Sequence, residues 1–128
     1  MSLNKNTDFS TLPYIIAVDA DGTLWNDEFP EIGSSINTEF IDSLKRDQKK
    51  GAKLILWTCR TNEDGGRAYL DEAVDKCKEC GLVFDAVNDN IAEVKARGWD
   101  ARKVYADVYL DDQAIHIHYQ TTMCKICP

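Results

Sequence analysis

Short apolar runs separated by polar segments dominate the hydrophobic pattern of the chain. Residues 14–18 form an apolar run of strand length that is followed by a polar loop, which is typical of a strand buried on both faces, and residues 53–58 predict a second strand. Two further runs, at residues 82–87 and 105–110, predict a third and a fourth strand. The pattern therefore predicts four strands.

Between these runs, apolar residues recur at helical spacing. Ser34 or Ser35 can cap a first helix that ends at Gly51, and a second helix is expected from residues 65–66 to Gly81. A short third helix is expected over residues 91–97. The apolar stripes of the two longer helices are Ile36, Phe40, Ile41 and Leu44, and Leu70, Ala73, Val74 and Cys77.

Alternating strands and helices predict an α/β fold, a Rossmann-like three-layer sandwich with a mainly parallel sheet. We expect one domain over residues 13–120, with a flexible leader at 1–12 and a tail at 121–128. In such sheets ligands bind beyond the carboxyl ends of the strands. The polar residues expected at these ends are Asp19, Asp21, Thr58, Asn88, Asp111 and Asp112.

The carboxylates at these strand ends predict a metal site. If the first and fourth strands are neighbours, four carboxylates meet, and each close pair repels by roughly 3 kcal/mol at an effective dielectric of about 20. Such a site must bind a proton or a cation. A set of oxygen ligands at a partly hydrated position favours Mg²⁺, which also attracts phosphate groups.

The order of the polar motifs resembles the haloacid dehalogenase superfamily of phosphotransferases. An Asp-Ala-Asp-Gly-Thr sequence follows the first strand from Asp19, Thr58 ends the second, and Lys103 precedes the terminal acid pair Asp111 and Asp112. Residues 103–115 also resemble small bacterial and phage members of that superfamily whose function is uncharacterised. The resemblance spans about residues 14–112.

This resemblance implies a phosphatase that forms an aspartyl-phosphate on Asp19, one oxygen of which would bind Mg²⁺ while the other attacks phosphorus. Asp21 would protonate the leaving oxygen and then activate water, while its backbone carbonyl binds the metal. Thr58 would donate a hydrogen bond to a phosphoryl oxygen, and Asp111 and Asp112 would complete the Mg²⁺ site.

A lysine is the fourth part of the family pattern, and it would balance the charge of the nucleophile and the phosphoryl group. Lys103 is the candidate, although it lies close to Asp111 in the sequence, and Arg102 or Lys95 could substitute for it. The segments between the motifs are too short for a large cap domain. We therefore expect an open site for a small phosphorylated metabolite, such as a nucleotide or a sugar phosphate, or for a phosphorylated end of a larger molecule. The protein could form a homo-oligomer in which a neighbouring subunit serves as the lid.

Several residues have two interpretations. Arg60 could bind a substrate phosphate through its planar donor fork, or pair with a nearby acid. Asn88 is typical of a turn and could also contact substrate. Cys77/Cys80 and Cys124/Cys127 have the count of a four-thiolate zinc site, but Cys77 falls on an apolar helix face, where a cysteine acts as a small hydrophobe. His116 and His118 could share a face of a strand and bind a metal ion, and exposure to solvent on an edge strand is the simpler interpretation.

The composition excludes some function classes. The net charge of −7 argues against a nucleic-acid-binding surface, and no apolar run reaches the roughly 18 residues of a membrane span. The first twelve residues lack the apolar core of a signal peptide, so we expect a cytoplasmic protein with reduced cysteines.

Two other functions compete with a phosphatase on the same fold. A phospho-accepting signalling receiver has similar length and uses Mg²⁺, but its acid pair comes on the first strand, whereas here the pair comes last. A zinc-stapled binding protein without turnover is the other alternative, and it would contain stoichiometric zinc.

Overall fold

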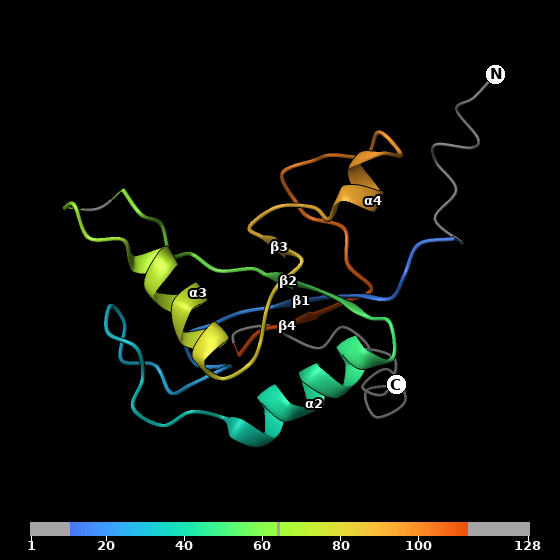
Figure 1. Cartoon of the computed structure of the whole chain (residues 1–128). Coiled ribbons are helices and arrows are strands. Elements are labelled where there is room, and N and C mark those ends of the chain that lie inside the picture. The colour runs from blue at the N-terminus through green and yellow to red at the C-terminus, as the bar shows by residue number, and fades with distance from the viewer. Residues whose placement is uncertain (1–10, 64, 113–128) are drawn as a thin grey trace, which may run out of the picture.

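A four-stranded parallel sheet forms the centre of the computed structural model, which describes residues 11–63 and 65–112 (Figure 1). The strand order is β3-β2-β1-β4, so the first strand lies between the second and the fourth. Ile16 pairs with Leu54 on one side and with Val108 on the other. The strands are β1 (Ile15–Val18), β2 (Lys53–Leu56), β3 (Ala86–Val87) and β4 (Val108–Leu110).

Helices cover both faces of this sheet. Helices α2 (Thr38–Lys49) and α3 (Tyr69–Glu79) lie on one face, and the short helix α4 (Ala92–Lys95) lies on the other (Figure 1). The structure thus confirms the predicted Rossmann-like three-layer α/β fold without a large cap.

Two hydrophobic clusters occupy the two faces, because successive strand residues point to opposite sides. One cluster joins Ile16 and Val18 to α2 and α3 through Leu44 and Cys77, among others. The other joins Ile15 and Ala17 to Ile91, Val94 and Val104. Strand β1 therefore contributes to both clusters, and its carboxyl end is where the candidate site begins.

The third and fourth strands are shorter than predicted, and an aspartate precedes each of them. Asp85 accepts a hydrogen bond from the backbone N–H of Leu54 at 2.8 Å, and Asp107 accepts one from Ile15 at 2.7 Å. At the point where each strand pairing begins, the carboxylate thus accepts the hydrogen bond of a backbone N–H group on the neighbouring strand. The spacing of apolar residues along the sequence does not distinguish a short strand preceded by such an aspartate from a longer strand.

Both long helices begin later than predicted. The cap of α2 is Asn37, whose side chain accepts from the Phe40 N–H, rather than Ser34 or Ser35. Ser35 instead pairs with Asn26, accepting from its backbone N–H at 3.1 Å. Helix α3 begins at Tyr69, after the Gly65–Gly66 turn. The segment before α2 is therefore folded back on itself.

The leader residues 1–10, His116, His118, Cys124 and Cys127 lie outside the described residues. Among the residues that the structure describes, no helix combines the length and apolarity needed to cross a bilayer.

Candidate functional site

The loop after β1 is held by backbone hydrogen bonds. The Asp19 N–H donates to the Leu110 carbonyl at 2.9 Å, which ties the end of β1 to the end of β4. The N–H groups of Thr23 and Leu24 both donate to the Ala20 carbonyl, at 3.1 and 2.8 Å. A tight turn therefore follows Asp19 and brings the chain back across the strand ends.

Three carboxylates meet at this turn. Asp19, Asp111 and Asp112 each offer an oxygen, and these oxygens all lie within 4.8 Å of one another. The backbone N–H of Asp112 donates to the Thr23 hydroxyl at 3.2 Å, and a β-carbon on Gly22 would overlap the Asp112 carboxylate. The predicted meeting of the acids of β1 and β4 is thus present for these three residues.

The electrostatics of this acidic cluster favour binding of a positive charge. Burial, followed by repulsion from Asp111, raises the pKa of Asp19 from 3.8 to about 7. Burial and a hydrogen bond shared with Asp111 also raise the pKa of Asp112. A divalent cation would neutralise the cluster, and an all-oxygen set of carboxylates fits Mg²⁺.

The Asp21 side chain does not join the cluster. Its carboxylate accepts two hydrogen bonds from Arg60, at 2.8 Å from Nε and 2.7 Å from Nη2, and a third from Trp25 Nε1 at 3.0 Å. Burial alone would raise the pKa of Asp21, but the bonds from Arg60 and Trp25 outweigh burial and lower it. Asp21 is therefore an ionised, fixed carboxylate next to the cluster.

Arg60 takes the second of its two predicted roles, pairing with an acid. Its side chain is 0% exposed. Besides Asp21, it donates to the carbonyls of Tyr69 and Glu31, both at 3.2 Å, and its guanidinium carbon lies 5.1 Å from the centre of the Phe29 ring. Its donors point into the protein, so the predicted contact with a substrate phosphate has no support in this geometry.

Thr58 and Asn88 are brought together at the ends of β2 and β3. The Asn88 side-chain oxygen accepts from the Thr58 N–H at 2.8 Å, and Asn88 has a positive φ of 50°, as its turn-forming interpretation predicts. The Thr58 hydroxyl accepts from the Arg60 N–H at 3.2 Å, which leaves the hydroxyl hydrogen to donate elsewhere. Asn88 thus orients Thr58, and its predicted contact with substrate stays a prediction.

Lys103 lies over an aromatic ring. Its ammonium is 5.3 Å from the centre of the Tyr109 ring, and the Tyr109 hydroxyl donates to the Val104 carbonyl at 2.6 Å. Within the described part of the chain, Lys103 makes no ion pair with Asp19. The alternative Lys95 pairs with Asp89 at 2.6 Å, one residue beyond Asn88. The role predicted for a lysine at Asp19 stays a prediction.

A second arginine, which sequence reasoning missed, holds the segment between Asn26 and Ser35. Arg67 donates to both carboxylate oxygens of Glu31, at 3.0 and 2.7 Å, and to those of Glu72, at 2.7 and 2.8 Å. The only sequence signal was a lone arginine after two glycines. The pairing joins the loop after Asp19 to the start of α3.

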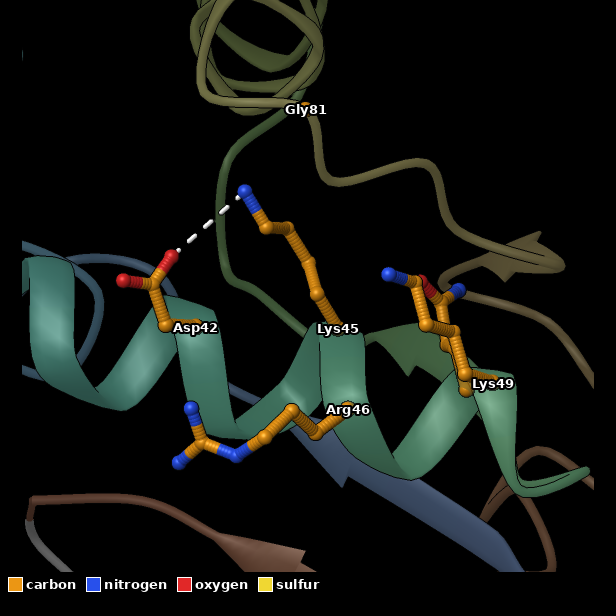
Figure 2. Close-up of a pocket in the computed structure, with 6 residues that line it drawn as sticks. Asp42, Lys45, Arg46, Lys49 and Gly81 are labelled. Carbon is orange, nitrogen blue, oxygen red and sulfur yellow. Dashed lines mark ion pairs between the residues drawn. The ribbon is translucent and has the colours of Figure 1, made fainter.

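A basic groove on α2 lies apart from these residues (Figure 2). Lys45 points toward Gly81, donates to the Cys80 carbonyl at 3.0 Å and pairs with Asp42 at 3.4 Å. Arg46 instead extends along α2, to the left in this view, and does not follow Lys45 toward Gly81. The cations do not converge, and Lys45 serves to bind the carboxyl end of α3.

Comparisons with known proteins give one informative match. No protein-family model matches the chain, and a search of curated proteins gives no significant match. A solved structure described as the conserved protein coded by a locus from Bacteroides thetaiotaomicron is 34% identical, with a TM-score of 0.66. The match covers 89% of this chain and 91% of that one. The chain therefore belongs to the same family as this conserved Bacteroides protein.

Proposed function

We propose that the chain is a Mg²⁺-dependent phosphohydrolase that forms an aspartyl-phosphate on Asp19. The observation that carries the proposal is the cluster of Asp19, Asp111 and Asp112, whose carboxylate oxygens lie within 4.8 Å of one another at the carboxyl ends of two adjacent strands. Carboxylates held this close favour binding of a proton or a cation, and the resemblance to the haloacid dehalogenase superfamily gives the first of them a nucleophilic role. Membership of that superfamily is part of the proposal.

Each residue has a task in this proposal. An oxygen of Asp19 attacks phosphorus, and water later releases phosphate from the phosphorylated side chain. The second Asp19 oxygen, Asp111, Asp112 and the Asp21 carbonyl would hold Mg²⁺, which when bound offsets the charge of the phosphoryl group. The Thr58 hydroxyl donates to a phosphoryl oxygen. The predicted acid and base, Asp21, faces Arg60 instead of Asp19 in this structure.

Hydrolysis of p-nitrophenyl phosphate with and without Mg²⁺ tests this proposal. We expect Mg²⁺-dependent release of phosphate by the wild type, and a loss of about 10³-fold or more in Asp19→Asn, because covalent catalysis depends on that one oxygen. Asp42→Asn on α2 is the matched control. Mass spectrometry of protein quenched during turnover should find the phosphoryl group on Asp19. Equal activity of wild type and Asp19→Asn would contradict the proposal.

A further inference from the structure

Arg60 is the buried centre of a hydrogen-bond network next to the candidate site. Its guanidinium binds both Asp21 oxygens at 2.7 and 2.8 Å and the carbonyls of Glu31 and Tyr69 at 3.2 Å. These partners belong to three segments: the loop after Asp19, the segment folded back before α2, and the start of α3. The orientation of the guanidinium is therefore determined from three sides.

This network also determines where the Asp21 carboxylate points. Both of its oxygens accept from Arg60, and Trp25 Nε1 adds a third donor at 3.0 Å. The Asp21 carboxylate lies outside the group of oxygens that Asp19 forms with Asp111 and Asp112. Separating this two-point ion pair, in which the Arg60 side chain is fully buried, is strongly unfavourable, and this cost favours an Asp21 carboxylate that stays on Arg60 when substrate binds at Asp19.

We infer that Arg60 is a positioning residue that holds Asp21 away from the leaving group, so that the site selects substrates whose leaving oxygen departs without a proton. The inference rests on the proposed function and names its substrate class. Acyl phosphates, aryl phosphates and phosphoanhydrides have such leaving groups. Alkyl phosphates, including most sugar phosphates, do not, because an alkoxide is strongly basic.

The two chemical steps balance without a proton from Asp21. In the first, an Asp19 oxygen forms a bond to phosphorus, the bond from phosphorus to the leaving oxygen breaks, and its electron pair departs with that oxygen. In the second, water bonds to phosphorus, the electron pair of the phosphorus–Asp19 bond returns to the carboxylate, and the proton of the water passes to solvent. The net reaction consumes one water and yields phosphate and the leaving group, which solvent protonates if it is basic.

A series of substrates tests this with the wild-type protein alone. Acetyl phosphate, p-nitrophenyl phosphate, phenyl phosphate and glycerol phosphate cover leaving groups of increasing basicity. The measured quantity is kcat/KM with Mg²⁺, which reports the steps up to phosphoryl transfer to Asp19. We expect kcat/KM to fall by about 10²- to 10⁴-fold from the nitrophenyl to the alkyl ester, the factor that a general acid would otherwise supply. An alkyl ester cleaved within about tenfold of the nitrophenyl ester would overturn the inference.

Variants test the part played by Arg60. Arg60→Gln removes the guanidinium that donates two hydrogen bonds to Asp21. We expect this variant to have an alkyl-to-aryl ratio of kcat/KM that is higher by about tenfold or more. Arg60→Lys keeps the positive charge but not the two-point contact, so its alkyl-to-aryl ratio should lie between those of the wild type and Arg60→Gln. Arg67→Gln is the matched control, because Arg67 binds Glu31 and Glu72 but not Asp21. A folded Arg60→Gln protein with the wild-type ratio would overturn the inference.

Failure of the inference is distinct from failure of the proposed function. If Arg60→Gln does not fold, the wild-type substrate series decides. Asp19→Asn is measured in parallel, with enzyme-free blanks for acetyl phosphate. Turnover of all four substrates at similar rates, abolished in Asp19→Asn, would keep the proposed function and overturn the inference. No turnover of any substrate would overturn both.

Discussion

The Asp112 carboxylate lies against the α-carbon of Gly22, in the space that a β-carbon at that position would fill. Gly22 also has a φ of +85°, which L side chains rarely adopt. The contact joins the loop after β1 to the end of β4 and helps to hold Asp112 near Asp19.

Gly22→Ala should therefore weaken Mg²⁺ binding as well as the fold. Gly98→Ala is the matched control, since Gly98 has a φ of +80° and open space around it. Both variants should lose about 1 kcal/mol of unfolding free energy from the backbone alone. Only Gly22→Ala should also lose affinity for Mg²⁺, measured by calorimetry. Identical Mg²⁺ affinities in the two variants would contradict a role for this contact.

The raised pKa of Asp19 predicts that stability without metal falls as pH rises. Well below its ordinary pKa of 3.8, the carboxyl is protonated in both the folded and the unfolded chain. Between its ordinary value of 3.8 and its folded value of about 7, the unfolded chain binds fewer protons, so rising pH favours unfolding. Mg²⁺ removes the repulsion, so it should raise Tm more at about pH 8 than at about pH 5.

Asp19→Asn is the control for this pH dependence, because an amide does not ionise. Thermal melts with Mg²⁺ or a chelator, across pH, measure the effect in both proteins. A metal-dependent rise in Tm that is the same at every pH would count against the acidic cluster as its source.

The two arginines should differ greatly in their effect on stability. Arg60→Met leaves Asp21 partly buried and unpaired, and we expect it to cost about 3–5 kcal/mol of unfolding free energy. Arg67→Met removes contacts to Glu31 and Glu72 that solvent screens, so its loss should be small and should shrink further with added salt. Urea unfolding of both variants at low and high salt measures this. A larger loss in Arg67→Met would show that the exposed network is the stronger tie.

The stability of the protein should depend on whether the side chain at position 88 can accept a hydrogen bond. Asn88→Ala removes the acceptor of the Thr58 N–H and places alanine at a φ of +50°, so we expect a loss of about 1–3 kcal/mol. Asn88→Asp keeps an acceptor and a residue type that tolerates this conformation, so it should lose less. Denaturant unfolding compares them, and kcat reports whether Thr58 has moved. Equal stability of the two variants would show that the hydrogen bond contributes little.

Several parts of the fold and the site could be predicted from the amino-acid sequence. The apolar runs of β1 and β2 and the stripes of α2 and α3 predicted the layers correctly, because burial of a strand or a helix face leaves a repeating pattern. The strand-end positions of Asp19, Asp111 and Asp112 predicted their meeting on the condition that β1 and β4 are neighbours, and the strand order of the structure meets that condition. The short lengths of β3 and β4 were not predicted, because the side chains of Asp85 and Asp107 accept hydrogen bonds from backbone N–H groups of the neighbouring strands.

Sequence alone determined the parallel character of the sheet, its helical layers and the acids that end β1 and β4, because these follow from local periodicity and from the rules of parallel sheets. Tertiary structure decided the strand order that makes β1 and β4 neighbours. Tertiary structure alone decided that Asp21 faces Arg60 rather than Asp19, and that Lys103 lies over Tyr109. Asp21 and Arg60 are 39 residues apart. A carboxylate pairs with whichever cation the folded chain brings within hydrogen-bond distance, and no local pattern encodes that choice.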